Sequence, residues 1–337
     1  MSDTAQDAGT ATTGTAAGRL AVPKTYKLYI GGAFPRSESG RSYPVTSGDG
    51  RFLANAAQAS RKDARDAVAA ARKAFPGWSG ATAYNRGQVL YRVAEVLEGR
   101  REQFLAEVAQ AESTQAESTQ AEGTQADRGT PQDTVRAVDA AIDRWVWYAG
   151  WADKVATVFG AANPVAGPYF SFTVPEPTGV VAILAPQASS LLGLVSVLAP
   201  VLCTGNTAVV VAAQERPLPA ITLAEVLATS DLPGGVVNVL TGRTAELAPW
   251  LAAHAEVNAL DLTGAPDAIR ADLERAAAGT VKRVLRASAA VGTAAVGASA
   301  VGASAVGAAE PDWTAEPDLR RLRAFLEAKT VWHPMGA

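Results

Sequence analysis

The stretch VVAILAPQASSLLGLVSVLAPVLCTGNTAVVV, residues 180–211, decides the fold of this chain of 337 residues. It contains two short runs of Val, Ile, Leu and Ala, at 180–184 and 208–211, separated by an apolar segment that ends near Gly205. Continuous apolar runs of this kind are typical of strands buried on both faces of a sheet. A helix between two such strands is the crossover of a parallel α/β fold, so the stretch predicts a strand, a helix and a second parallel strand.

The run from Leu191 to Ala213 carries no charge and is long enough to suggest a membrane span. Pro200 and the turn at 204–206 interrupt it near the middle, which favours a buried helix followed by a buried strand. We therefore expect no membrane partner.

The pattern continues along the chain. Two further apolar runs, at 236–240 and 259–262, follow a second helical segment that starts at Leu218 and ends near the glycines at 234–235. This alternation predicts a Rossmann-like, doubly wound parallel sheet, whose ligand sites lie at the carboxyl ends of the strands.

The segments before this region are mostly helical. Residues 26–34, YKLYIGGAF, alternate like a strand that enters a Gly-Gly turn, which predicts a hairpin. Apolar residues at steps of three and four predict one amphipathic helix over 85–110 and another over 133–160. The stretch 168–178, with prolines at its turn, predicts a further hairpin.

Three segments have the composition of unfolded or solvated chain. Residues 1–24 are a polar, low-complexity stretch that we expect to be a disordered tail. Residues 111–130 repeat AESTQ with a period of five, which forms no apolar stripe on a helix, so a solvated insertion is expected. Residues 291–311 repeat Val, Gly and Ala and predict a flexible linker to a C-terminal helix and strand at 312–337.

The overall composition excludes several classes of protein. Lys and Arg (30) nearly balance Asp and Glu (33) without a basic patch, which argues against a nucleic-acid partner. The two histidines are far apart in the sequence, so no metal site is expected. A single cysteine excludes an internal disulfide, and the first twenty residues lack the apolar core of a signal peptide. We expect a cytoplasmic protein.

Five blocks in this chain, in this order, resemble the NAD(P)-dependent aldehyde dehydrogenases: EPTGVVAILAP, LAPVLCTGNTAVVV, DLPGGVVNVLTG, LTGA and VKRV. The resemblance implies that 25–290 form the family's cofactor-binding domain. It also implies that the hairpin at 168–178 and the strand near the C-terminus are the elements through which family members assemble into oligomers. The catalytic domain is expected to be absent, with the repeat at 291–311 in its place.

The resemblance also implies that the catalytic groups are lost. Ala188 stands where the family has the asparagine that stabilises the oxyanion, and Ala287 stands where it has the general-base glutamate. The only thiol, Cys203, lies in an apolar segment without a neighbouring His or Lys, so we interpret it as a buried core residue.

The cofactor contacts implied by the resemblance are lost in part. Val211 and Gln214 replace a lysine and a glutamate that bind the adenosine ribose, while Ala265 and Ile269 replace a serine and a glycine near the pyrophosphate. We therefore expect no tightly bound cofactor, and NAD(P) is implied by the resemblance alone. The remaining candidates for cofactor contacts are Pro186, Gly242, Thr263 and Gly264.

Three hypotheses for function follow. In the first, the chain is an inactive paralogue that forms a homo- or hetero-oligomer with an active aldehyde dehydrogenase as a structural or regulatory subunit. The second is an NAD-dependent oxidoreductase that converts an aldehyde to a carboxylate. The third is a decaying nucleotide-binding module without a maintained role, which the tandem repeats favour because such repeats expand where little constrains the chain.

Overall fold

A computed structural model describes residues 24–48, 50–112, 131–286 and 311–335. Its centre is a sheet of five parallel strands in the order β10 (Arg283–Leu285), β9 (Ala259–Asp261), β6 (Val180–Leu184), β7 (Thr207–Val211) and β8 (Val237–Leu240). The predicted Rossmann-like parallel sheet is thereby confirmed. The strand order reverses between β6 and β9, and such a switch point is where open α/β sheets hold ligands.

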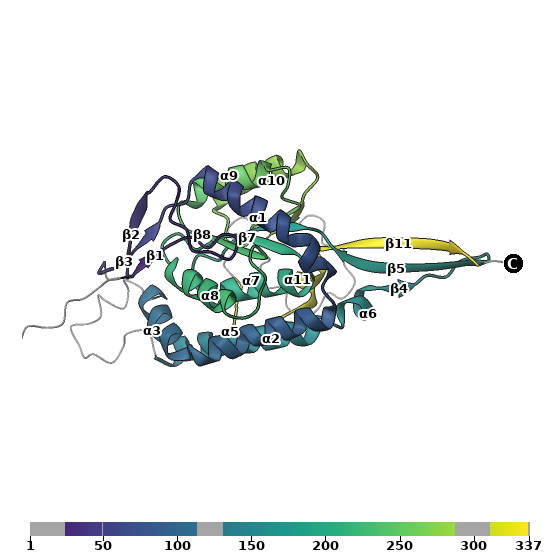
Figure 1. Cartoon of the computed structure of the whole chain (residues 1–337), viewed down its shortest axis with the longest axis horizontal. Helices are drawn as coiled ribbons and strands as arrows, with labels where there is room; N and C mark the ends of the chain where they lie inside the picture. Colours follow the sequence, from purple (N-terminus) through teal and green to yellow (C-terminus); the bar gives the residue numbers. More distant parts are fainter. Residues whose placement is uncertain (1–23, 49, 113–130, 287–310, 336–337) are drawn as a thin grey trace, which may run out of the picture.

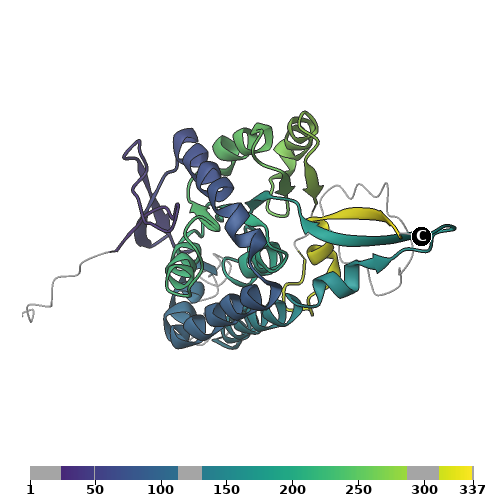
Figure 2. The same cartoon turned by 45° about the vertical axis from the view of Figure 1, so that its right-hand side comes forward.

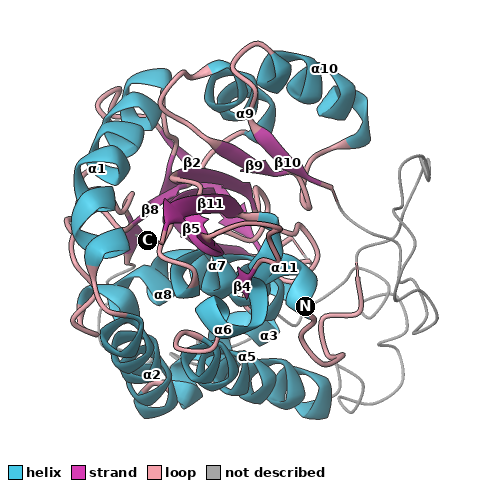
Figure 3. Cartoon of the chain, turned by 90° about the vertical axis from the view of Figure 1, so that its right-hand side faces the viewer, coloured by secondary structure: helices cyan, strands magenta, loops and turns pink. Residues whose placement is uncertain are grey.

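Helices cover both faces of this sheet (Figure 3). On one face lie α7 (Leu192–Cys203) and α8 (Leu218–Ala228), backed by α2 (Ala83–Gly99) and α5 (Pro131–Trp151). On the other lie α1 (Arg61–Gly80), α9 (Thr244–Ala253) and α10 (Asp267–Ala278). Alternate residues of each strand enter the two cores, so that Val210 packs in the first and Val209 in the second. None of the helices in the described part of the chain is both long and apolar enough to span a membrane.

The prediction of a single helix over 85–110 is wrong in one respect. The helix is interrupted at Arg100, which separates α2 from α3 (Arg101–Glu112). Gly99 has a weak helix preference, and the break allows the Arg100 guanidinium to reach Glu225 on α8, 2.6 Å away. Helix α3 also includes the first two residues of the predicted insertion at 111–130. The rest of that insertion lies outside the described residues.

The N-terminal segment forms a small sheet of β1 (Thr25–Tyr26), β3 (Phe52–Ala57) and β2 (Ser42–Thr46). The Gly-Gly turn predicted within 26–34 exists, with positive φ angles at both glycines, but the pairing across it is short: Ile30 and Ala33 exchange hydrogen bonds, and Leu28 donates to the carbonyl of Pro35. Tyr29 instead exchanges backbone hydrogen bonds with Val239 of β8. Lys24, assigned to the tail, forms an ion pair with Glu225 at 2.7 Å.

A long arm projects from this body (Figures 1 and 2). It begins with α6 (Val155–Phe159) and consists of β4 (Ala161–Ala162), β5 (Tyr169–Pro177) and β11 (Leu326–Pro334). The prediction of a hairpin within 168–178 is wrong, because this stretch forms the single strand β5. Strand β5 pairs with β4 on one edge and with all nine residues of β11 on the other. The C-terminal helix and strand predicted within 312–337 are present as α11 (Leu319–Ala324) and β11. The repeat at 291–311 lies outside the described residues except for Pro311.

Candidate functional site

The carboxyl ends of the parallel strands bring most of the predicted site residues to one edge of the sheet. Pro186 follows β6, Gly242 follows β8, and Thr263 and Gly264 follow β9. All four are buried. Ala287, predicted at the position of the general base, lies outside the described residues.

A chain of amide groups connects three of these strand ends. The Gln187 side chain donates to the carbonyl of Ala185 at 2.7 Å, and its Oε1 accepts from the backbone N–H of Gln214 at 3.0 Å. The Gln214 Oε1 in turn accepts from the backbone N–H of Thr244, at the first turn of α9, at 3.2 Å. The segments after β6, β7 and β8 are thus held together by the chain's own hydrogen bonds. Sequence reasoning found Gln214 but missed Gln187 as its partner.

Val211 is fully buried at the end of β7. It aligns with Leu184 of β6 and Leu240 of β8, and its side chain packs in the core beneath α1, α9 and α10. A valine in this environment has no group to offer to a sugar hydroxyl.

The turn after β9 is closely packed against β6. The N–H of Gly264 donates to the carbonyl of Leu184 at 2.9 Å, and a Cβ at this position would lie 1.8 Å from the carbonyl oxygen of Ala185. Only glycine fits there. The neighbouring Thr263 donates from its backbone N–H to Oδ1 of Asp261 at 3.0 Å, and Oδ2 of Asp261 forms an ion pair with Arg321 at 2.7 Å.

The first turn of α10 is occupied by the chain's own charges. Arg270 donates to the carbonyl of Ala265 at 3.0 Å and forms an ion pair with Asp267 at 2.7 Å. Ile269, which stands at a predicted glycine position, is partly buried and packs against the core. A β-branched side chain there limits how closely a ligand can approach the helix backbone.

Ala188 lies in an exposed loop after β6 and carries no side-chain donor. Arg216 donates to its carbonyl at 2.5 Å. The next part of the loop is held by Glu112 of α3, whose Oε1 accepts from both the N–H and the hydroxyl of Ser190, at 2.6 and 2.8 Å. Sequence reasoning missed Glu112 because it was assigned to the repeat insertion.

Cys203 is fully buried at the end of α7, as the interpretation of it as a core residue requires. Its Sγ donates to the carbonyl of Tyr148 at 3.2 Å, and burial raises the pKa of the thiol to about 12. The thiol is therefore neutral at physiological pH and is a poor nucleophile.

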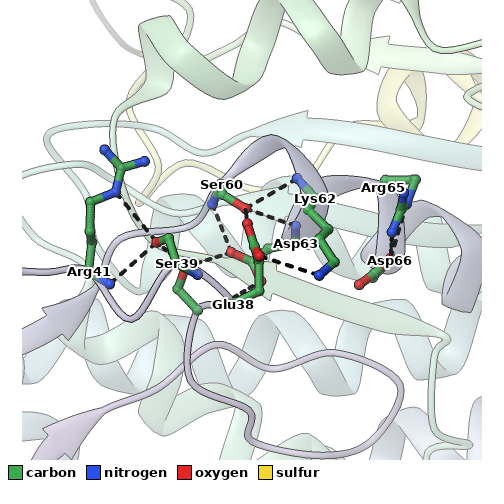
Figure 4. Close-up of polar contacts among 9 residues, drawn as sticks. Glu38, Ser39, Arg41, Ser60, Lys62, Asp63, Arg65 and Asp66 are labelled. Carbon is green, nitrogen blue, oxygen red and sulfur yellow. Dashed lines mark hydrogen bonds and ion pairs between the residues drawn. The ribbon is translucent and has the colours of Figure 1, made fainter.

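A groove of about 870 Å³ lies beside the strand ends, between the start of α1 and α9. Figure 4 shows several polar groups near the start of α1 paired with one another. Ser60 caps the helix through the N–H groups of Lys62 and Asp63, while Asp63 accepts from the Ser60 N–H and from the Ser37 hydroxyl. Glu38 accepts from Ser60 and from Lys62. These contacts anchor the preceding loop to α1 on one side of the groove.

Across the described ranges, no three His, Cys, Asp or Glu side chains are grouped so that they could hold a metal ion.

The parallel sheet, its switch point and its glycine turns define a doubly wound α/β domain of the nucleotide-binding type, with an added strand arm. The chain belongs to the aldehyde dehydrogenase family, whose model matches residues 35–300.

Two curated relatives illustrate the similarity. The cytosolic aldehyde dehydrogenase 1 of Elephantulus edwardii is 31% identical over 262 residues, which cover 77% of this chain and 49% of that protein. Human retinal dehydrogenase 2 is 32% identical over 267 residues, covering 77% of this chain and 48% of that protein. The chain thus spans about half the length of the curated relatives it matches.

Solved structures show the same relation. HpcC from Thermus thermophilus superposes with a TM-score of 0.69 at 28% identity, covering 78% of this chain and 48% of that one. The NAD⁺ complex of an aldehyde dehydrogenase from Bacillus cereus superposes with the same TM-score at 24% identity, over 78% of this chain and 50% of that one, and shares the fold.

Proposed function

We propose that this chain is a catalytically inactive member of the aldehyde dehydrogenase family that acts as a structural or regulatory subunit of an active aldehyde dehydrogenase. The observation that carries the proposal is the arm formed by β5 and β11, which extends exposed aromatic side chains away from the body, together with a strand edge that pairs with no other strand of the described residues.

The loss of activity is supported by the strand ends. Val211 is enclosed in the core, and Gln214 is hydrogen-bonded within the chain. Ala188 offers no hydrogen-bond donor from its side chain, and the buried, protonated thiol of Cys203 is unsuited to attack an aldehyde. These features of the described positions support a loss of activity.

Assembly is supported by the surface of the arm. On one face of the arm, Trp332 is 62% exposed and its ring lies 5.8 Å from that of Tyr169 on the neighbouring strand. On the other face, Phe170 is 53% exposed and its ring lies 5.3 Å from that of Phe172. Large apolar side chains that gather on an exposed surface usually mark an interface.

The backbone of the arm supports the same conclusion. Strand β11 lies at the edge of its sheet, with β5 as its partner on one side. A nine-residue edge strand presents a row of N–H and C=O groups that can pair with another sheet. The partner we propose for this edge is a family member about twice as long as the region that this chain matches.

Coexpression of the tagged chain with a full-length aldehyde dehydrogenase from the same organism tests the proposal. We expect the tagged chain to purify together with the enzyme and the complex to form NADH from NAD and an aldehyde. The tagged chain alone should form none. Aldehyde-dependent NADH from the chain purified alone would contradict the proposal and favour the oxidoreductase hypothesis.

A further inference from the structure

Asp261 is a carboxylate with no exposed surface, at the carboxyl end of a central strand. Its backbone neighbours across the sheet are Ile183 of β6 and Leu285 of β10. A charge in such a position is costly unless it is paired and hydrogen-bonded. Its partner is therefore informative about how the fold is held together.

The partner comes from the C-terminal segment, sixty residues later in the chain. One nitrogen of the Arg321 guanidinium donates to Asp261 at 2.7 Å, and another donates to the Thr263 hydroxyl at 2.9 Å. The guanidinium also lies over the ring of Trp313, 5.4 Å from its centroid. With only 11% of its side chain exposed, Arg321 fills the strand end, next to the turn where a parallel sheet holds a ligand.

The same segment is fixed to the body at other points. Buried Arg144 of α5 donates to the carbonyl groups of Trp313 and Ala315 at 2.7 and 2.9 Å. The carbonyl of Phe325 accepts from the N–H of Thr178 and from the side chain of Asn206. Because β11 begins directly after Phe325, these contacts set the base of the arm.

We propose that the Asp261–Arg321 pair is a latch that ties the base of the arm, residues 313–326, to the carboxyl ends of the parallel strands. The pair is the only one of these contacts that joins two opposite charges, and both belong to side chains rather than to the backbone. Glu327 at the start of β11 also pairs with Arg283 of β10, but that pair is exposed, whereas the Asp261–Arg321 pair is enclosed. Opening the Asp261–Arg321 pair loosens the base of the arm at the strand end, while the hydrogen bonds of the sheet and those from Arg144, Thr178 and Asn206 stay in place. The existence of the latch does not depend on the proposed function. Its role does, because we expect the latch to hold the arm, the proposed interface, in one orientation.

Hydrogen exchange of the purified full chain, measured by mass spectrometry, tests the latch. The double variant Asp261→Asn/Arg321→Met removes both charges together, so that no buried charge is left unpaired. We expect amides in 313–326 to exchange at least about tenfold faster than in the wild type, with β6 and β7 unchanged. Arg323→Met, an exposed arginine on the same helix, is the matched control and should change nothing.

Two outcomes would overturn the latch. Wild-type exchange over 313–326 in the double variant would show that the pair does not hold the segment. Equal acceleration in β6 and β7 would show that the pair supports the whole sheet. Because the chain is measured alone, a failure of the proposed assembly with an active enzyme leaves this result unaffected.

Discussion

At the scale of single residues, Gln214 shows how this chain uses the end of its sheet. Its side chain accepts from Thr244 and donates to Glu215, and its backbone N–H donates to Gln187. These groups would have to give up their present partners before they could contact a ligand. The polar groups of Gln214, after β7, are thus used in hydrogen bonds within the chain.

We therefore expect weak binding of NAD. Contacts to NAD that the resemblance implies are lost or obstructed at four positions: Val211, Gln214, Ala265 and Ile269. A hydrogen bond to a ligand contributes on the order of 1 kcal/mol, so several losses together weaken binding by orders of magnitude. Isothermal titration calorimetry measures the affinity, with an active aldehyde dehydrogenase as the positive control. A dissociation constant in the low micromolar range would contradict this expectation.

Gly264 is expected to tolerate no larger residue. In Gly264→Ala the new methyl group would lie 1.8 Å from the Ala185 carbonyl oxygen, so the two strand ends must separate. We expect a loss of about 3 kcal/mol or more in the free energy of unfolding, measured by urea denaturation. Gly77→Ala is the control, since Gly77 lies in helix α1 and a Cβ added there would have nothing within 4 Å. The control should be neutral or stabilising, and equal losses in both variants would refute the packing argument.

Cys203 should be unreactive in the folded chain. With its pKa raised to about 12 by burial, the thiol stays protonated at pH 8, and the thiolate is the reactive form. We expect reaction with Ellman's reagent only after denaturation in guanidinium chloride. Rapid reaction of the native chain would mean that the thiol is accessible and acidic.

Much of the candidate edge could be predicted from local sequence, and some of it could not. Gly242, Thr263 and Gly264 directly follow apolar strands, so their place at the strand ends follows from the pattern. The pairing of Asp261 with Arg321 joins residues sixty positions apart, and no local pattern links them. The same is true of Glu112 and Ser190.

At the scale of elements, the apolar runs predicted the central strands closely because strands buried on both faces admit few other residues. The break at Arg100 was missed because the apolar periodicity continues across it on the two helices. The partners of β5 were missed for a different reason. Its pairing with β11 closes a loop of more than a hundred residues, which no spacing in the sequence reveals.

The arm should be separable from the body. Deleting Lys329 to Ala337 removes most of β11 but leaves Leu322 and Phe325 in the core, together with the Arg321 contacts. We expect the truncated chain to keep its α/β circular dichroism and cooperative unfolding but to lose copurification with an active aldehyde dehydrogenase.

A point variant narrows this test to the surface. Trp332→Ser should weaken copurification, while Phe52→Ser should not. Phe52 is 52% exposed but lies on β3, which Figure 1 shows at the end of the body opposite the arm. Full-strength assembly by the truncated chain would show that the arm is not the interface.

At the scale of the whole molecule, the chain combines a complete two-faced α/β body with an arm that is anchored in it. Both cores are closed by the chain's own helices, and the C-terminal segment contributes Trp313, Leu322 and Phe325 to the larger one. A chain that spans about half of its relatives can therefore form a packed body by itself. Within the described part of the chain, the edge of β11 and the aromatic side chains of the arm remain exposed.

Sedimentation velocity tests the central claim most directly. The chain, labelled with a fluorophore at low micromolar concentration, is run alone and with an excess of a full-length aldehyde dehydrogenase from the same organism. We expect the label to move into a faster-sedimenting complex when the enzyme is present, and Trp332→Ser to reduce that shift. A label that sediments as a 34.7 kDa monomer beside every such enzyme would contradict the account.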